Sequence, residues 1–280
     1  MIAPINKIID SSLVDGPGNR TAVFFQGCNF NCRYCHNPET INLCVSCKKC
    51  VENCPGGALW EQGDKILWEE SKCLQCDRCI TECGHNASPK ISYLSVEALE
   101  KRVLKNMPFI RGVTCSGGEC TLYKNYITDL FGRLKRAGLS CLLDSNGSAA
   151  DFSREPELIK VTDGVMLDIK AWDTEYHTQL TGKDNKLVLE NAVFLASISK
   201  LTEIRTVVAR NYLNNKETVM KAAKLLQPFL HQSSIRYRLI KFQPFGVRKE
   251  YQSLGTPGDQ EMQELKCIAG NYGFSDVIIT

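Results

Sequence analysis

Short apolar runs recur along most of the chain, and segments of helical length separate them. The runs typical of buried strands are 21–25, 112–115, 139–143, 164–169, 203–209, 237–242 and 277–279. The segments that predict helices are 95–105, 126–137, 187–199, 217–226 and 259–269. Continuous apolar strands that alternate with helices predict an α/β fold with a parallel sheet covered on both faces. At least six such units favour an open or closed (β/α) barrel, whose sites lie at the C-terminal ends of its strands.

The segment from about 40 to 90 breaks this alternation. Cysteine occurs every third or fourth residue over much of it, a Pro-Gly-Gly turn stands at 55–57, and few apolar residues lie between. So little apolar surface cannot fold a segment by burial, and we expect bound metal to hold it together. We therefore divide the chain into barrel at 1–39, an insert at 40–90, and the remainder of the barrel at 91–280.

Composition and charge exclude several classes of protein. The apolar fraction of 43% is ordinary for a globular chain, and a net charge of +3 argues against a nucleic-acid partner. No apolar run approaches the ~20 residues of a membrane helix, so no membrane partner is expected. The first residues do not have the pattern of a signal peptide, and we expect a cytoplasmic protein.

Cysteine is the unusual feature, because eleven of the fifteen fall between residues 28 and 83 in three tight groups. In a long chain without a signal peptide, such grouping indicates metal ligation. The first group is Cys28, Cys32 and Cys35. Three thiolates can hold three irons of a 4Fe–4S cluster and leave the fourth open for chemistry. The alternative is a zinc site completed by His36.

The other two groups repeat one pattern. They are Cys44, Cys47, Cys50 and Cys54, followed by Cys73, Cys76, Cys79 and Cys83. This spacing is that of bacterial two-cluster ferredoxins, in which the fourth cysteine of each run ligates the other cluster. The predicted ligand sets are therefore Cys44, Cys47, Cys50 and Cys83 for one cluster and Cys73, Cys76, Cys79 and Cys54 for the other. Paired zinc ribbons are the alternative.

Four cysteines remain outside these groups. Cys115, Cys141 and Cys267 are expected to be buried as small apolar residues. Cys120 follows a glycine pair, where it could face a site.

The first cysteine group carries a family resemblance. With Tyr34 before its last ligand and Asp-Gly-Pro-Gly at 15–18, it resembles the radical SAM superfamily, in particular the activating enzymes of glycyl radical enzymes such as pyruvate formate-lyase. The doubled insert resembles the branch with two auxiliary clusters, and the short chain is similar to YjjW-like members. The resemblance implies a partial (β/α)6 TIM-like barrel with an inserted ferredoxin-like dicluster domain.

The resemblance also implies residues that contact S-adenosylmethionine (SAM). Backbone at the glycine motif would hold the amino group of SAM, an Asp-Ser pair with Met and Asp would form a monovalent-cation site (Na+ or K+) beside its carboxylate, and a lysine would lie near the same group. These residues, with two neighbours of the thiol loop, are Gly117, Gly118, Glu119, Asp144, Ser145, Met166, Asp168, Lys170, Tyr34 and His36. The alternatives are an ordinary turn for the glycines and a structural salt-bridge network for the charges.

Along a strand Met166, Asp168 and Lys170 share one face, so all three can point the same way. Lys170 is one of three residues that the resemblance places in the catalytic set. The others are Asp15 and Arg205, which would receive the glycine loop of the partner. A structural role for Arg205 is the alternative.

Two positions depart from the family pattern. Many relatives carry a SAM-contacting histidine on the sixth strand, whereas residues 240–246 contain none and Gln243 stands there instead. Cys120 occupies a place where proline usually follows the glycine motif.

The resemblance implies an enzyme that reductively cleaves SAM to a 5′-deoxyadenosyl radical and abstracts a hydrogen from a glycine of a partner glycyl radical enzyme. The cofactors would be three 4Fe–4S clusters and SAM, and the electron donor would be of flavodoxin or ferredoxin type. Two alternatives stay open at this point. One is a radical SAM enzyme acting on a small molecule or a non-glycine protein residue, and the other is a plain iron–sulfur electron carrier.

Overall fold

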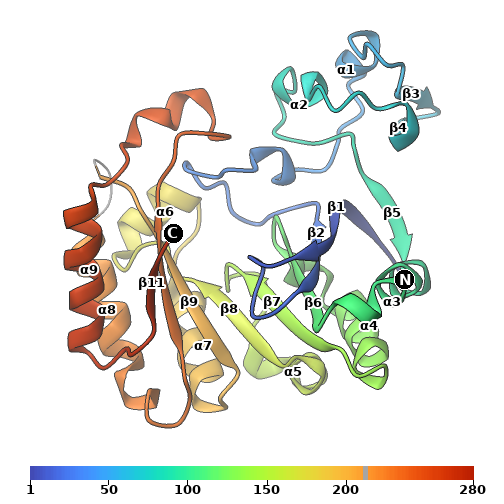
Figure 1. Cartoon of the computed structure of the whole chain (residues 1–280). Helices are drawn as coiled ribbons and strands as arrows, with labels where there is room; N and C mark the ends of the chain where they lie inside the picture. The colour runs from blue at the N-terminus through green and yellow to red at the C-terminus, as the bar shows by residue number, and fades with distance from the viewer. Residues whose placement is uncertain (211–213) are drawn as a thin grey trace. The chain divides into compact units, whose positions relative to one another are not determined.

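The computed structural model describes residues 1–210 and 214–280, which form two compact units. The first unit contains residues 1–29 and 37–140, and the second contains residues 30–36 and 141–280. Their elements are labelled in Figure 1. Within the described residues, no helix has the length and apolar character needed to cross a bilayer.

The second unit is built on a parallel sheet in the order β7-β8-β9-β10-β11. Its strands are β7 (Ser140–Ser145), β8 (Gly164–Asp168), β9 (Leu201–Val208), β10 (Arg236–Lys241) and β11 (Val277–Ile279). Its helices are α5 (Pro156–Val161), α6 (Thr174–Thr181), α7 (Lys186–Ser197), α8 (Asn215–Leu226) and α9 (Asp259–Asn271). Short 3-10 turns lie at Phe152–Arg154, Gln227–Phe229 and Lys249–Leu254.

Helices cover this sheet because its strands are apolar on both faces. Val165, Met166 and Leu167 of β8 are all at most 1% exposed, although they point alternately to opposite faces. Helix α7 packs on β8 and β9, and α8 lies against α9, which in turn contacts β10 and β11 (Figure 1). The predicted α/β fold is confirmed, and every strand expected from an apolar run is present.

The first unit has four sheet strands in the order β5-β1-β2-β6. They are β1 (Ile2–Ser12), β2 (Arg20–Phe25), β5 (Ser92–Ser95) and β6 (Gly112–Gly117), with helices α3 (Val96–Lys105) and α4 (Lys124–Arg136) and 3-10 turns at Pro38–Thr40, Met107–Phe109 and Cys120–Tyr123. Strands β2 and β6 are parallel, whereas β1 is antiparallel to both neighbours. Sequence analysis missed β1, because polar residues interrupt its apolar positions. Ser95 caps α3 as predicted and accepts a hydrogen bond from the Ala98 amide.

The cysteine-rich segment of this unit contains little regular structure. It holds α1 (Lys49–Glu52), the hairpin β3 (Leu59–Gln62) and β4 (Lys65–Trp68), a 3-10 turn at Glu70–Lys72 and α2 (Arg78–Thr81). Between residues 43 and 86, all of them described, Ala58 and Leu59 are the buried apolar residues. Burial of one alanine and one leucine leaves the segment dependent on other stabilisation.

The cysteines outside the three groups divide into buried and exposed. Cys115, Cys120 and Cys141 are completely buried, as expected for the first and last of them. Cys267 is exposed, so its predicted burial is wrong. On α9 the inward positions are taken by Met262, Leu265 and Ala269, which leaves residue 267 on the outer face.

Candidate functional site

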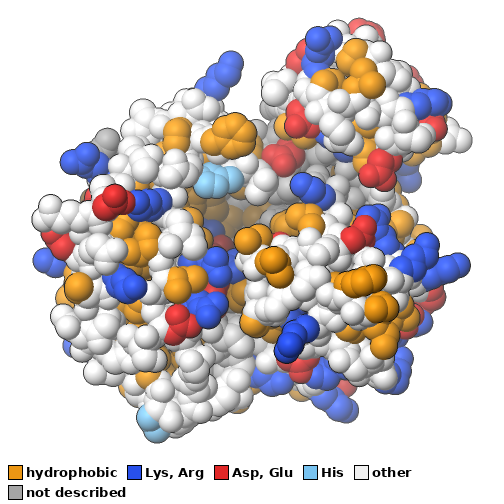
Figure 2. Space-filling view, viewed as in Figure 1, with side chains coloured by type: hydrophobic (Ala, Val, Ile, Leu, Met, Phe, Trp, Pro, Cys, Tyr) orange, Lys and Arg blue, Asp and Glu red, His pale blue; other side chains and the backbone are white. Residues whose placement is uncertain are grey.

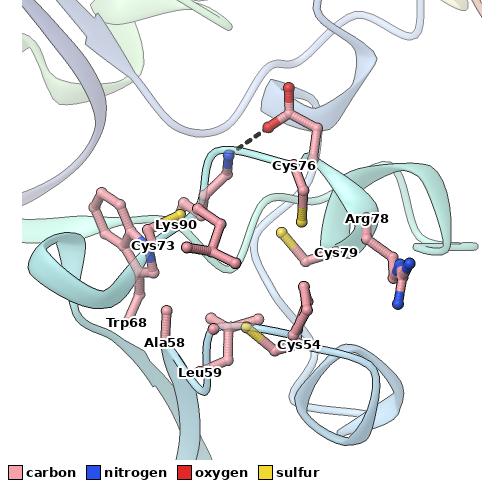
Figure 3. Close-up of a pocket in the computed structure, with 13 residues that line it drawn as sticks. Cys54, Ala58, Leu59, Trp68, Cys73, Cys76, Arg78, Cys79 and Lys90 are labelled. Carbon is pink, nitrogen blue, oxygen red and sulfur yellow. Dashed lines mark hydrogen bonds and ion pairs between the residues drawn. The ribbon is translucent and has the colours of Figure 1, made fainter.

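Two pockets in the cysteine-rich segment are each lined by cysteines drawn from both runs. Cys54, Cys73, Cys76 and Cys79 line one pocket, shown in Figure 3. Cys44, Cys47, Cys50 and Cys83 line a second pocket, to which Cys79 also contributes. In each pocket the fourth cysteine of one run joins the first three of the other. The structure thus brings together the same sets that the ferredoxin-like spacing groups.

The two cysteine runs also share an unusual backbone. Residues in the left-handed region flank the second cysteine of each run. Ser46 and Lys48 flank Cys47, with φ of 54° and 68°, and Gln75 and Asp77 flank Cys76, with φ of 53° and 54°. Side chains other than glycine rarely adopt this conformation, and it persists where the surroundings impose it. Successive turns of this kind aim backbone N–H groups inward, as in anion-binding nests. This repeated backbone conformation is suited to bind an electron-rich group through its N–H groups.

Each pocket has at least the four thiols that a 4Fe–4S cluster takes as ligands. A zinc ion would need four ligands converging at roughly 2.3 Å. Among the described residues, no three His, Cys, Asp or Glu side chains converge in a way that could hold one metal ion. Four sulfurs spread around one cavity match the donors of a 4Fe–4S cluster, in which each thiolate binds a different iron.

The first thiol group begins in one unit and ends in the other. In the first unit, the Cys28 amide donates to the carbonyl of Ile41 at 2.8 Å. In the second, the thiol loop is fastened to the end of α6, where the Asn31 amide donates to the Thr181 carbonyl at 2.8 Å. Arg248 donates to the Cys32 carbonyl at 2.8 Å. Sequence analysis did not single out Arg248, because this contact joins residues that are far apart in the chain.

Within the second unit, Cys32 lies beside a partly buried charge pair at the end of β8. The Lys170 ammonium is 2.8 Å from an Asp168 carboxylate oxygen and 5.7 Å from the centre of the Tyr34 ring. Burial raises the pKa of the Cys32 thiol to about 12, and the charge of Lys170 opposes that shift. Burial also raises the pKa of Tyr34, whose hydroxyl is buried without a hydrogen-bond partner among the described residues.

Two cross-strand pairs place four predicted site residues on one face of the second unit. Asp144 on β7 is opposite Met166 on β8, and Asp168 on β8 is opposite Arg205 on β9. The Arg205 guanidinium is 2.8 Å from an Asp144 carboxylate oxygen and donates to the Met166 sulfur at 3.0 Å. The sequence-predicted residues of this strand face therefore meet in space.

Glu203, which sequence analysis missed, anchors this arrangement. Its carboxylate is 5% exposed and pairs with Arg205 at 2.5 Å and Arg238 at 3.0 Å. A buried carboxylate must be paired to remain charged. The signal available in the sequence was the alternation of charges on the two strands, which carry Glu203, Arg205, Arg236 and Arg238.

These contacts bear on the expected alkali-cation site. Asp144 and Met166 contact Arg205, and Asp168 pairs with Lys170. Ser145 is buried and accepts a hydrogen bond from the Gly147 amide at 3.0 Å. Basic side chains of the protein therefore already balance the charges that a Na+ or K+ ion would meet there.

In the first unit, the glycine motif packs directly on the start of the thiol loop. A Cβ on Gly118 would lie 2.2 Å from the Gly27 carbonyl oxygen, and one on Gly117, where φ is +116°, would lie 2.2 Å from the Phe25 amide nitrogen. The Glu119 amide donates to the Gly27 carbonyl at 2.8 Å. Both glycines are required by this close approach. The Glu119 carboxylate is turned inward and accepts from Thr121.

His36 lies at the segment that lacks the expected histidine. Its ring centre is 6.3 Å from that of Phe242, and the Gln243 backbone forms a hydrogen bond with it. A Cβ on Gly246 would lie 2.5 Å from the His36 carbonyl oxygen, so glycine permits the contact. Burial lowers the pKa of His36, which favours a neutral ring.

Asp15 lies in the first unit, on a loop with two glycines of positive φ. Its carboxylate accepts from the Ser12 hydroxyl, and its carbonyl accepts from the Thr114 hydroxyl at 2.6 Å. The neighbouring side chains Leu13 and Val14 are exposed. Arg205 lies in the second unit, so the expected partnership of Asp15 and Arg205 stays a prediction.

Comparison with known families decides which family this is. The family model for the radical SAM superfamily matches residues 22–210, more than half of the chain. The chain belongs to the radical SAM superfamily. The expected resemblance is confirmed at this level.

Relatives of this radical SAM protein are activating enzymes. It is 31% identical to the trans-4-hydroxy-L-proline dehydratase activating enzyme of Clostridioides difficile, over 93% of this chain and 94% of the relative. It is 31% identical to the pyruvate formate-lyase 2-activating enzyme of Escherichia coli strain K12, over 91% and 82%. It is 26% identical to the choline trimethylamine-lyase activating enzyme of Oleidesulfovibrio alaskensis, over 99% and 98%. Activating enzymes of this type are oxidoreductases, so the expected enzyme class is confirmed.

Solved structures agree with the fold. A domain of the pyruvate-formate lyase-activating enzyme of Bacteroides vulgatus matches with a TM-score of 0.51 and 20% identity, over 60% of this chain and 98% of that one. QueE of Escherichia coli matches with a TM-score of 0.53 and 14% identity, over 100% and 94%. At these identities the likeness concerns the α/β radical SAM fold alone.

Proposed function

We propose that this radical SAM enzyme activates a glycyl radical enzyme by abstracting a hydrogen atom from one of its glycines. The observation that carries the proposal is the charged group around Cys32 and Lys170, in a chain 31% identical to activating enzymes along more than nine-tenths of its length. The Asp-Gly-Pro-Gly loop with its exposed Leu13 and Val14 supplies a surface for a protein substrate rather than a small molecule.

Cys28, Cys32 and Cys35 would hold the SAM-binding cluster. When bound, that cluster supplies the electron that splits SAM into methionine and the 5′-deoxyadenosyl radical that attacks the glycine. The chain itself must exclude water and offer matching charges. Cys32 is 8% exposed and Lys170 is enclosed with Asp168, so the thiol loop has the sheltered surroundings that such chemistry requires.

The SAM methionine would be held by two groups of residues. Backbone at Gly117 and Gly118 would take the amino group, and Lys170 would take the carboxylate. Asp144 and Asp168 would position the same end, with Arg205 and Lys170 balancing their charge. An alkali cation would have to compete with Arg205 for Asp144 and Met166.

His36 is our proposed substitute for the missing histidine of the sixth strand. Its ring lies against Phe242 at the end of β10, where relatives with the usual motif carry their own imidazole. Neutral imidazole offers one donor and one acceptor to an adenosine moiety. Tyr34 would pack beside it from the same loop.

The cysteine-rich segment would carry two further 4Fe–4S clusters as a ferredoxin-like insert over residues 40–90. Support comes from the two pockets with crossed cysteine sets and from the repeated left-handed backbone. Two clusters side by side favour an electron relay from a flavodoxin- or ferredoxin-type donor. A module that serves only for docking would need no second cluster.

The proposal is tested by mixing the anaerobically reduced holoprotein and SAM with candidate partner enzymes. We expect a glycyl-radical doublet in electron paramagnetic resonance (EPR) spectra and one equivalent of 5′-deoxyadenosine per radical. A Cys32→Ala variant should give neither product, because its cluster would lose one of three ligands.

The other outcomes separate the alternatives. SAM cleavage that yields 5′-deoxyadenosine without a glycyl radical on any partner would point to a small-molecule or non-glycine substrate. No SAM cleavage by protein that contains all its iron would leave an electron carrier.

A further inference from the structure

The two cysteine pockets of the insert differ in the charge buried in their walls. The pocket of Cys54, Cys73, Cys76 and Cys79 is also lined by Lys90, whose side chain is 12% exposed. Lys90 forms an ion pair with Asp77, marked by the dashed line in Figure 3, and the Asp77 side chain is 59% exposed. Water screens the carboxylate more strongly than the ammonium, so the pair leaves a net positive field inside the pocket.

Lys90 is protonated and lines the same pocket as the cysteines. Burial lowers the pKa of Lys90, but the hydrogen bond and charge of Asp77 outweigh burial, and the pKa is raised above its usual value. Lys90 lines the same pocket as Cys73, Cys76 and Cys79, so its ammonium charge acts on the sulfur atoms there. Negative charge on sulfur in this pocket is therefore stabilised by Lys90.

A second, independent feature of the same wall is Trp68, at the end of β4. Its indole stands at the edge of the pocket (Figure 3), and its Nε1–H is buried without a partner among the described residues. A buried donor left unpaired costs about 1–3 kcal/mol, which an acceptor in the pocket would remove. Sulfur atoms of a cluster and its thiolates are such acceptors.

The pocket of Cys44, Cys47, Cys50 and Cys83 has neither feature. Its charged lining residues Lys48, Lys49 and Glu82 are all exposed. Lys48 occupies the place in its run that Asp77 occupies in the other, and it pairs with Glu61 at the surface. Exposed charges contribute little because water and ions screen them.

We infer that Lys90 and Trp68 raise the reduction potential of the cluster at Cys54, Cys73, Cys76 and Cys79 above that of its neighbour, which makes it the first insert cluster to accept an electron. The inference rests on the proposed insert clusters. Reduction adds one negative charge to a cluster, and nearby positive charge and hydrogen bonds to sulfur stabilise that charge. In this step the donor protein is oxidised by one electron and the insert cluster is reduced by one electron, with no bond made or broken.

The test is an EPR-monitored redox titration of the reconstituted holoprotein, made after iron analysis of each variant. Lys90→Met should lower one midpoint potential by about 59 mV, the equivalent of a tenfold change in the ratio of reduced to oxidised cluster. Lys90→Arg, which keeps the positive charge, should leave this midpoint potential close to that of the wild type. Asp77→Asn should move the same midpoint upward by less, because the carboxylate is screened.

Trp68→Phe should lower the same midpoint and leave the other two unchanged. Lys48→Met is the matched control in the neighbouring pocket and should leave all midpoints within error. Cys76→Ala should remove the midpoint that Lys90→Met shifts, which identifies the cluster as the one in this pocket.

The failures can be told apart. Fewer than three clusters by iron content, in wild-type protein fully reconstituted, would overturn both the insert proposal and this inference. Three clusters with midpoints that ignore Lys90→Met and Trp68→Phe, or that respond equally to Lys48→Met, would overturn the inference alone.

Discussion

Arg205 on β9 forms an ion pair with Asp144 on β7, although β8 lies between the two strands. The guanidinium spans that distance by passing Met166, whose sulfur accepts its second hydrogen bond. Glu203 holds the other side of the guanidinium, so Arg205 is fixed among two carboxylates and a thioether. The arrangement places a permanent cation where the family resemblance leads us to expect an alkali metal ion.

The first prediction concerns this built-in cation. Exchanging K+ for choline at equal ionic strength should change the rate of SAM cleavage by the wild-type enzyme less than about twofold. Arg205→Gln should lower the free energy of unfolding by about 3–5 kcal/mol, because it leaves buried carboxylates short of a partner. Added K+ should recover part of that loss in the variant, as measured by thermal unfolding of the holoprotein.

The control for this prediction is Arg154→Gln. Arg154 is 84% exposed in its pair with Asp151, so its loss should cost less than about 1 kcal/mol. Loss of wild-type SAM cleavage when choline replaces K+ would contradict the prediction. It would show that an alkali ion displaces Arg205 from Asp144 and Met166 in the active enzyme.

Crossed ligation in the insert makes a second prediction. Cys54→Ala and Cys76→Ala should each remove one cluster, and the double variant should lose no more iron than either single variant. Cys54→Ala combined with Cys47→Ala should remove two clusters, although Cys54 and Cys47 belong to one run. The measurement is iron and sulfide content after anaerobic reconstitution.

Cys141→Ala is the matched control for these losses, since Cys141 is buried in β7 and belongs to none of the three groups, so this variant should keep all iron. Loss of only one cluster from the Cys47 and Cys54 double variant would show that each run holds its own cluster. Stoichiometric zinc with little iron would overturn the cofactor assignment altogether.

A third prediction separates electron relay from docking. If the insert relays electrons, Cys76→Ala should slow SAM cleavage with a protein donor and spare cleavage with a small chemical reductant that reaches the SAM cluster directly. Rates with both donors, on protein whose circular dichroism is unchanged, decide the matter. Unchanged SAM cleavage with the protein donor in a folded variant that lacks the cluster would exclude the relay.

His177 supplies a prediction about pH. It is completely buried on α6, its Nδ1–H donates to the Lys183 carbonyl at 2.7 Å, and its Nε2 has no partner among the described residues. Burial lowers its pKa, so the folded protein resists a proton that the unfolded chain accepts below about pH 6.5. The contribution of His177 to the free energy of unfolding is therefore constant above that pH. Below it, this contribution falls as the pH drops, by up to about 1.4 kcal/mol per pH unit.

His177→Asn keeps a donor for Lys183 and cannot take up a proton. Anaerobic thermal unfolding of the holoprotein between pH 7.5 and 5.5 should show a shallower decline for this variant than for the wild type. His231→Asn, at an exposed position, should keep the wild-type slope. Equal slopes for the wild type and His177→Asn would show that other groups govern the acid loss.

Strands, helices and cysteine groups could be predicted from the sequence because they depend on near neighbours in the chain. Apolar continuity marked β8 and β9, and the Ser95 cap marked the start of α3. Ligand spacing grouped the first three cysteines of each run because they lie within a few residues of one another, and the ferredoxin-like pattern assigned the fourth cysteine of each run to the other cluster. Strand β1 escaped prediction because polar residues break its apolar pattern.

Only the tertiary structure decided which side chains meet. Local patterns do not show that Arg205 takes Asp144 and Met166, that His36 lies against Phe242, or that Lys90 and Trp68 share the wall of a cysteine pocket. These contacts join residues far apart in sequence, and their energies depend on burial, which a charge or ring acquires only after strands and loops have packed. The exposure of Cys267 follows the same rule, because the face of α9 that turns inward is selected by the sheet it covers.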